Sequence, residues 1–318
     1  MFFINNILHP EFTWPTVPSS PNHKLPKLHR LSPRPLRRFW AYVHKLLVKF
    51  SVWYCRWSDI PAPGQIWQLP FGLILKWSDG TRLEEVLTMK AARDAGIPVP
   101  RVICYGEHDD TPHAPVSILM TRMPGSTLYE ELWEWFGPDE KARVLQELKI
   151  YLHTIRRWRR PSEGDNKATS ICSIAGTSIR SVRVPSHSIG PCEDGAEFND
   201  LLLAPARSGW VRISDPDYED RLAKAERLHA VRHEVVFTHG DISPHNILVL
   251  DDGSVSALLD WEAAGWYPEY WEFTTAWRLS KPGSWWYEIV KELADGNYVE
   301  EREGDLAGRI LTADSMAW

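Results

Sequence analysis

Two side chains suited to a divalent cation stand at the open end of a predicted β-hairpin. The apolar runs 247–250 and 255–259 flank an Asp-Gly pair, the strongest short hairpin signal in a sequence. A two-residue turn at 252–253 then sets Asn246 beside Asp260 by antiparallel pairing. Amide and carboxylate oxygens are ligands that Mg²⁺ accepts while it keeps water and phosphate oxygens. The spacing therefore predicts a magnesium site at this end of the hairpin.

A third acidic residue precedes the same hairpin. Asp241 lies on the loop His239-Gly240-Asp241 that enters the first strand. From there it could face a substrate hydroxyl while Asn246 and Asp260 hold Mg²⁺ on a nucleoside triphosphate. The pattern predicts phosphoryl transfer, with Asp241 as catalytic base and His239 supporting the loop through a hydrogen bond.

These motifs resemble a known family. His239, Asp241 and Asn246 fit the protein-kinase pattern H-x-D-x-x-x-x-N, but Gly240 replaces the arginine and Asp260 is followed by Trp-Glu. The stretch is similar to the aminoglycoside phosphotransferase and choline kinase-like family of the protein kinase-like superfamily, and its continuation 263–272 resembles fungal members. The resemblance implies a bilobal α+β fold, with a small β-rich N-lobe and a larger, mainly helical C-lobe. It also implies ATP or GTP with Mg²⁺ as cofactors.

A lysine and a glutamate in the N-terminal half could steady the nucleotide phosphates. Lys76 ends an apolar strand, and the helix after it starts with a capping-box pattern in which Thr81 is the N-cap and Glu84 reaches back to it. Glu85 is then the acid left to pair with Lys76, and the family resemblance also favours Glu85. Alternatively, both glutamates are exposed acids near a helix N-terminus, where they are favourable.

The strand at 116–121 runs into a Pro-Gly bend that corresponds to the hinge between the lobes in this family. The resemblance implies that backbone groups near Arg122 and Met123 bind adenine. The Gly-rich pattern that covers phosphates in protein kinases is absent from 60–72.

We expect three parts along the chain. Residues 1–35 form a poorly ordered or wrapping segment, residues 36–122 form the N-lobe with a preceding amphipathic helix, and residues 123–318 form the C-lobe with a substrate-side insertion at 161–205. The helix predicted over 36–54 carries interleaved basic residues. It either packs on the small lobe with a solvated basic face, the alternative we favour, or lies on an anionic membrane.

Composition excludes several classes of protein. A formal net charge of -6 gives no reason to expect nucleic acid as a partner, and no apolar run is long enough to span a bilayer. Four scattered cysteines indicate reduced thiols in a cytoplasmic protein, with zinc not expected. The start of the chain lacks the features of a secretory signal. Oligomeric state is not predicted.

The expected function is a small-molecule kinase acting on a hydroxyl group. The acids Glu193, Asp194 and Glu197 could face a cationic amine on the substrate, or they are solvated loop acids. The 17 tryptophans could build an aromatic cage for a quaternary amine, but core packing is the favoured explanation. Two alternatives stay open, namely a catalytically silent nucleotide-binding scaffold of the same fold and a protein kinase.

Overall fold

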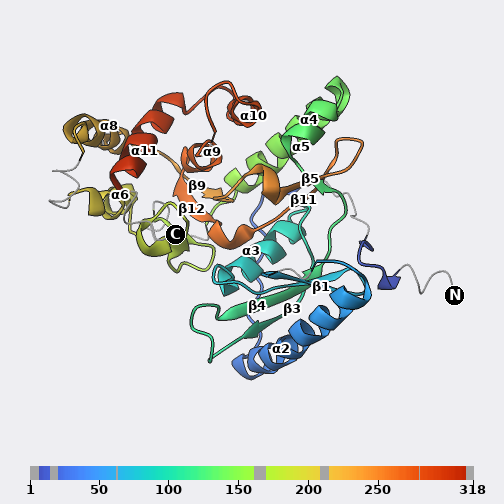
Figure 1. Ribbon diagram of the computed structural model, residues 1–318. Coiled ribbons are helices and arrows are strands. Elements are labelled where there is room, and N and C mark those ends of the chain that lie inside the picture. The colour runs from blue at the N-terminus through green and yellow to red at the C-terminus, as the bar shows by residue number, and fades with distance from the viewer. Residues whose placement is uncertain are drawn as a thin grey trace. The chain divides into compact units, whose positions relative to one another are not determined.

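The computed structural model of the chain describes residues 7–14, 21–61, 64–160, 170–207, 215–278 and 280–312. These residues form two compact units (Figure 1). The first unit draws on 1–22, 26–128 and 247–262, and the second on 23–25, 129–246 and 263–318. A hairpin from late in the sequence thus belongs to the first unit. Antiparallel sheets and separate helices make up both units, which confirms the predicted α+β class.

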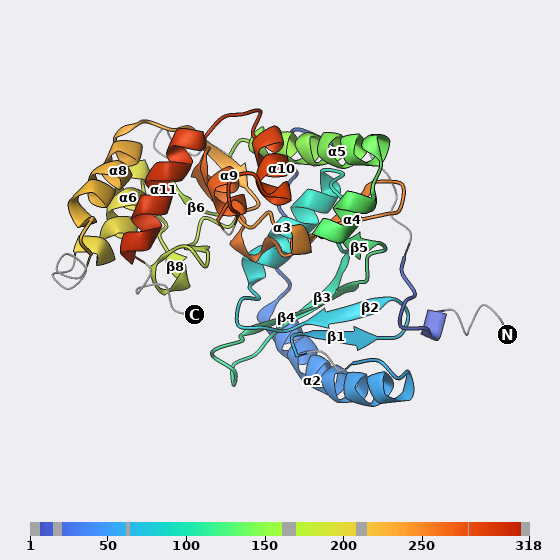
Figure 2. The same ribbon diagram turned by 45° about the horizontal axis from the view of Figure 1, so that its top comes forward.

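A four-stranded antiparallel sheet forms the centre of the first unit. Its strands, in spatial order, are β1 (Ile66–Leu69), β2 (Leu73–Lys76), β4 (Val116–Thr121) and β3 (Val102–Glu107). Successive side chains of a strand point to opposite faces. On β2, Leu75 packs in an apolar cluster with residues of α2 (Arg34–Trp57), whereas Lys76 contacts α3 (Leu83–Asp94). The two helices lie on opposite sides of the sheet (Figure 2).

The start of α3 differs from the prediction. The N-cap is Arg82, in extended conformation and without a side-chain cap, so the capping box with Thr81 as N-cap is wrong. The Thr81 hydroxyl instead contacts the Ser78 amide at 3.2 Å and the Ser78 hydroxyl at 2.9 Å. The tight turn before the helix uses the hydroxyl that the cap would have needed.

The late hairpin has the predicted pairing at its open end. β10 (Ile247–Val249) pairs with β11 (Val255–Leu258) so that Ile247 lies opposite Leu258, and β10 also pairs with β5 (Ser126–Thr127). The predicted two-residue turn is wrong, because the Gly253 amide donates to the Leu250 carbonyl at 3.0 Å and centres the turn one residue earlier. An extra residue in β11, Ser256, forms a bulge that shifts the register back, so Ile247 still lies opposite Leu258 at the open end.

Part of the N-terminal segment lies against the first unit. The Phe71 amide donates to the carbonyl of Ile7 at 2.7 Å, and the Tyr54 hydroxyl donates to the carbonyl of Leu8 at 2.6 Å. Further along, the Asn22 amide donates to the carbonyl of Ala95 at 2.7 Å. Residues 1–6 and 15–20 of this segment lie outside the described residues.

Helices dominate the second unit. They are α4 (Glu130–Trp135), α5 (Pro138–Arg156), α6 (Gly195–Leu203), α8 (Tyr218–Ala230), α9 (Trp271–Ala276), α10 (Trp285–Leu293) and α11 (Val299–Thr312). Two small antiparallel sheets accompany them, β6 (Cys172–Ser173) with β12 (Gly265–Pro268) and β9 (Val235–Thr238), and β7 (Ile179–Arg180) with β8 (Ser188–Ile189). Helix α5 begins at Pro138, because proline is tolerated in the first turn of a helix. Residues 161–169 of the predicted insertion lie outside the described part.

Tryptophans of the second unit pack in its core. Trp158, Trp271 and Trp277 are almost fully buried. The indole N–H of Trp277 donates to the Tyr287 carbonyl at 3.1 Å, and that of Trp286 donates to the Ala276 carbonyl at 2.9 Å. The burial of these rings, and for Trp277 and Trp286 the paired indole N–H groups, indicate core packing, the favoured of the two explanations for these residues.

Candidate functional site

Lys76 is surrounded by carboxylates of the first unit. Its Nζ donates to both carboxylate oxygens of Glu85, at 2.9 and 3.1 Å, and to Asp260 Oδ1 at 2.7 Å. Glu262 Oε2 lies 3.3 Å from the same nitrogen. Of the two acids that the sequence offered, Glu85 is therefore the one on Lys76.

The cluster carries more negative than positive charge. Glu85 and Lys76 are buried, whereas the side chains of Asp260 and Glu262 are 37% and 22% exposed. Burial lowers the pKa of Lys76, but the three carboxylates together raise it above its ordinary value, so the ammonium stays protonated. Burial raises the pKa of Glu85, and the charge of Lys76 opposes this rise.

The carboxylates are close enough to share a cation. One oxygen each from Glu85, Asp260 and Glu262 can be chosen so that all three lie within 4.8 Å of one another. Oxygen-rich, partly exposed acids with excess negative charge suit Mg²⁺, which binds one or two carboxylates and keeps its other ligands from water and phosphate. The residues present therefore fit a magnesium ion.

The backbone around this cluster is tightly constrained. Asp260 has a φ of 62°, a left-handed conformation that is uncommon for a residue other than glycine. A Cβ atom added at Gly80 would come 2.2 Å from Glu262 Oε2, which only glycine avoids. Strained backbone of this kind concentrates at functional sites, because the surrounding structure must hold it in place.

The second unit holds the loop that carries Asp241. The short turn η4 (Pro244–Asn246) follows this loop. The side-chain nitrogen of Asn246 donates to the backbone oxygen of Asp241 and to Asp241 Oδ2, both at 2.9 Å. This orientation uses the amide nitrogen of Asn246 on Asp241 and turns its amide oxygen elsewhere.

His239 and Gly240 shape the same loop. His239 is buried, and its Nδ1 accepts a hydrogen bond of 3.3 Å from the Asp241 amide. Gly240 has a φ of 84°, and a Cβ there would lie 2.5 Å from the Ala263 carbonyl oxygen. A side chain such as arginine cannot occupy this position without moving the backbone.

Glu272 is a residue that the sequence did not single out. It is fully buried at the start of α9, and its two carboxylate oxygens accept from the His239 amide at 2.6 Å and the Gly240 amide at 3.1 Å. Burial raises its pKa to about 7, against the effect of these two amides. The Trp-Glu pair at 271–272 is a visible signal, but the sequence does not say that this acid is buried or that it faces the loop.

Arg278 also escaped the sequence analysis. It lies just beyond α9 and is partly buried. Burial lowers the pKa of its guanidinium, and the charge of Asp241 opposes this change. Asp241 is thus within electrostatic reach of a cationic side chain of its own unit.

The predicted hinge residues lie at the end of β4 in the first unit. The Arg122 amide donates to the Gly72 carbonyl at 2.7 Å, so this donor is used within the sheet. The Arg122 side chain reaches the Pro10 carbonyl and also Gln68 Oε1, the latter at 3.1 Å. Met123 is buried. The carbonyl of Arg122 and the amide of Met123 remain the backbone groups for the predicted contact with adenine.

Two of the acids considered for substrate binding cap a helix. Asp194 accepts from the Glu197 amide at 3.0 Å, and Glu197 Oε2 accepts from the Glu193 amide at 2.7 Å. The Asp194 side chain thus caps the start of α6, and Glu197 binds the amide of the residue before the cap. Helix capping explains these acids without a cationic substrate.

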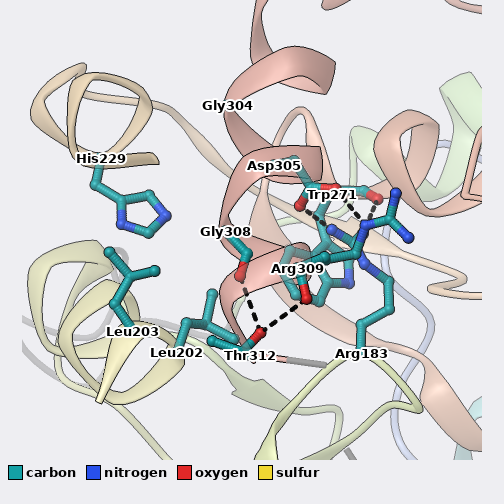
Figure 3. A pocket seen from close by; sticks show the side chains of 10 residues that line it. All are labelled: Arg183, Leu202, Leu203, His229, Trp271, Gly304, Asp305, Gly308, Arg309 and Thr312. Carbon is teal, nitrogen blue, oxygen red and sulfur yellow. Dashed lines mark hydrogen bonds and ion pairs between the residues drawn. The ribbon is translucent and has the colours of Figure 1, made fainter. Parts of the chain in front are cut away.

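Two hollows formed by described residues of the second unit are lined by residues other than Asp241. One of about 370 Å³ lies where β9 begins and β12 ends, with Val235 and Pro268 in its wall, whereas the loop of Asp241 leaves the other end of β9. Another, between α6, α8 and α11, has a volume of only about 30 Å³ (Figure 3). A space of that size holds one or two water molecules rather than a substrate.

The wall of this small cavity contains a buried cation. The Arg183 guanidinium stacks on the Trp271 ring, 3.9 Å from its centroid, and forms an ion pair with Asp305. Asp305 also pairs with Arg309 at 3.3 Å (Figure 3). Burial lowers the pKa of Arg183 to about 10, with Asp305 opposing the change. We interpret this group as a structural link between the loop at Arg183, α9 and α11.

Fold and motifs together identify the class of protein. The chain belongs to the phosphotransferase enzyme family, whose model matches residues 71–309. This match confirms the family predicted from the His-Gly-Asp and Asp-Trp-Glu motifs. The resemblance of 263–272 to fungal members stays a prediction. A search of curated proteins found no match.

Solved structures show the same fold. The GDP complex of an aminoglycoside 2′-phosphotransferase-IIIa mutant is 11% identical, with a TM-score of 0.55, and the match covers 85% of this chain and 87% of that one. The complex of APH(2″)-IIIa with GDP and kanamycin is 12% identical, with a TM-score of 0.53, and the match covers 86% and 89%. These likenesses confirm the kinase-like α+β fold.

No helix within the described residues combines the length and apolar character needed to cross a membrane.

The structure brings Lys76, Glu85 and Asp260 together in the first unit, and His239, Asp241 and Asn246 together in the second. Their roles in binding and catalysis stay predictions.

Proposed function

We propose that this protein is a cytoplasmic small-molecule kinase that transfers the γ-phosphate of ATP or GTP to a hydroxyl group. The observation that carries the proposal is the Lys76 cluster, in which one buried ammonium is held by Glu85 and Asp260, with Glu262 beside them. A lysine fixed in this way can contact nucleotide phosphates. The surplus of carboxylates suits the divalent cation that accompanies a triphosphate.

The residues divide the chemistry between them. Lys76, oriented by Glu85, binds phosphate oxygens, and Asn246 and Asp260 hold Mg²⁺, which when bound neutralises charge on the triphosphate. Asp241 accepts the proton of the acceptor hydroxyl while the oxygen of that hydroxyl forms a bond to the γ-phosphorus. The bond from that phosphorus to the bridging oxygen breaks, and the nucleoside diphosphate leaves. Positioning and charge neutralisation supply most of the rate enhancement.

The acceptor in this proposal is a small hydroxylated molecule. A protein of the same fold binds kanamycin, which carries hydroxyl and amine groups, so an amine-bearing acceptor belongs among the compounds to test. Arg278 places a positive charge within reach of Asp241, so acceptors with an anionic group belong there as well.

A thermal-shift experiment with turnover on the same samples tests the proposal. We expect Mg²⁺ with ATP or GTP to raise the midpoint of unfolding of the parent. Nucleotide at about 100 times its Kd stabilises by about 2.7 kcal/mol, or roughly 4 °C for a chain of this length. Asp260→Asn should abolish this shift. Asp251→Asn, which changes an exposed turn acid of the same hairpin, should retain it.

Turnover then separates an enzyme from a silent nucleotide-binding scaffold. A panel of neutral, amine-bearing and anionic hydroxyl compounds should contain at least one that raises nucleotide consumption by the parent. Asp241→Ala should retain the thermal shift and lose this turnover. A shift without turnover on any acceptor would favour the scaffold, and no shift with any nucleotide would reject the assignment of the Lys76 cluster.

A further inference from the structure

Helix α2 of the first unit exposes a row of large apolar side chains. Phe39, Tyr42, Trp53 and Trp57 each keep between 55% and 64% of their surface exposed. The complete row, with exposures from 40% upward, is Leu36, Phe39, Tyr42, Leu46, Phe50, Trp53 and Trp57. Scattered apolar residues on a surface are normal, but a continuous row of them marks an interaction site.

Helical geometry places this row on one side of α2. At 100° per residue the seven positions fall within an arc of about 120°. The buried residues of α2 occupy the adjoining arc, which meets the row at Leu36 and Tyr54, and they are Ala41, His44, Ser51, Tyr54 and Cys55. Both views show α2 along one side of the sheet (Figure 1, Figure 2). One side of the helix therefore packs on the sheet while the exposed apolar row faces away.

A basic strip lies beside the apolar row. By the same 100° geometry Arg38, Lys45, Lys49 and Arg56 fall within an arc of about 40°, between the buried face and the apolar row. Arg38 pairs with Asp109 at 2.7 Å and Lys45 pairs with Asp110. Within the described part of the chain, Lys49 and Arg56 are exposed and make no ion pair. The strip keeps uncompensated positive charge next to exposed aromatic rings.

The aromatic rings of the row contact one another and still remain exposed. The rings of Trp53 and Trp57 are stacked with centroids 6.3 Å apart, and the Phe50 and Trp53 centroids are 5.5 Å apart. These contacts leave 58% of Trp53 and 64% of Trp57 exposed. Aromatic residues with one apolar end and one polar atom are typical of the boundary between water and lipid.

We propose that the outer face of α2 docks this protein on an anionic lipid surface. The helix has 24 residues and would lie flat, with its apolar row among the upper acyl chains and its basic strip at the lipid headgroups. Charge complementarity selects anionic lipid, because each basic residue near such a surface strengthens binding about fivefold.

A second copy of this chain is a less suitable occupant. If two α2 helices packed antiparallel through their apolar rows, the side of one helix that carries the basic strip would lie next to the same side of the other helix. The two basic strips would then face each other and repel. A lipid surface covers the row and attracts the strip at the same time.

Vesicle flotation of the full chain tests the proposal. We expect the parent to float with phosphatidylcholine–phosphatidylserine vesicles and much less with phosphatidylcholine alone, and added salt should weaken the binding. Phe39→Glu with Trp53→Glu should weaken it at least tenfold. Lys49→Gln with Arg56→Gln should weaken it roughly 25-fold, from the loss of two basic contacts.

A control with the same change in charge uses exposed apolar residues of the other unit. Trp135 and Leu201 are 68% and 40% exposed, and Trp135→Glu with Leu201→Glu should leave vesicle binding unchanged. If the apolar variant of α2 fails to fold, the Gln variant and the salt dependence still decide. Equal binding to both kinds of vesicle, or no binding, would overturn the proposal. Sedimentation showing a dimer that Phe39→Glu dissociates, without vesicle binding, would overturn it in favour of a second copy.

Discussion

Replacing Glu272 by glutamine should impair catalysis without unfolding the protein. The buried carboxylate accepts from the amides of His239 and Gly240 at 2.6 and 3.1 Å and so fixes the loop before Asp241. Glutamine keeps the shape and one acceptor oxygen. Its NH₂ group, however, turns a donor toward one of the two amide donors, so that amide loses its partner.

The structure lets the two opposing contributions to stability be compared. Loss of one charge-assisted hydrogen bond costs about 1.5–3 kcal/mol. Against this, burial raises the pKa of Glu272 from 4.5 to about 7, so the ionised form in the fold costs about 3 kcal/mol relative to the protonated form. Above pH 7 the two contributions roughly offset. Glu272→Ala has no such offset and leaves both buried amides without an acceptor, at roughly 2–6 kcal/mol.

The sign of the pH dependence follows from the raised pKa. Between about pH 4.5 and 7 the folded protein binds more protons than the unfolded chain, so the contribution of Glu272 to stability is lost as the pH rises through this window. The glutamine variant lacks this titration. The difference in free energy of unfolding between parent and variant should therefore change by up to about 3 kcal/mol from pH 4.5 to pH 8.

Urea unfolding at several pH values and steady-state kinetics at pH 8 test both parts. We expect kcat of Glu272→Gln to fall about 100-fold, since a shift of about 1 Å in a catalytic loop has that effect. Most of the nucleotide-induced thermal shift should remain, because Lys76, Glu85 and Asp260 belong to the other unit. An unchanged kcat would refute the positioning role, and a pH-independent difference in stability would refute the pKa argument.

Three further changes test other parts of the structure. Asp305→Asn leaves the buried Arg183 without its anionic partner and should lower the free energy of unfolding in urea by about 3–5 kcal/mol, as is typical when one partner of a buried ion pair is removed. Asp200→Asn, in an exposed ion pair, should lower it by at most about 1 kcal/mol. Gly80→Ala pushes the neighbouring carboxylate away from its place and should reduce the Mg²⁺-dependent thermal shift, whereas Gly64→Ala, with open space around it, should not. Lys76→Met should raise the nucleotide Kd at least tenfold in calorimetry. It should also make the free energy of unfolding fall as the pH rises, because the three carboxylates of the cluster are left without their cation.

Local sequence patterns were enough to predict structure formed by neighbouring segments of the chain, such as the hairpin of β10 and β11. The Asp-Gly signal between the apolar runs 247–250 and 255–259 predicted a hairpin with Asn246 at its open end, and Ile247 does lie opposite Leu258. The turn between them was less certain from sequence, since Asp251, Asp252 and Gly253 support two turn lengths. The bulge at Ser256 of β11 reconciled the observed turn with the required register.

Long-range contacts explain most of what the sequence did not predict. Thr81 is a good N-cap residue in isolation, but the preceding turn uses its hydroxyl on Ser78. Glu272 looks like any helix acid in a Trp-Glu pair, and only the pairing of β12 with β9 shows that it lies under the loop of His239. The role of Glu272 depends on burial, and burial is a property of the assembled unit.

The two sides of α2 could not be told apart by the periodicity of its apolar residues. An apolar row at helical spacing predicts a buried face, and Ala41 and Tyr54 do lie against the sheet. A second apolar row, with Phe39 and Trp53, stays exposed because one sheet can cover only one side of a helix. The helix is therefore more apolar than its packing requires. A helix that only packs on a sheet would carry polar side chains on its outer face, where apolar ones add no stability. The exposed apolar row therefore indicates that α2 binds a second surface besides the sheet, and the basic strip indicates that this surface is anionic.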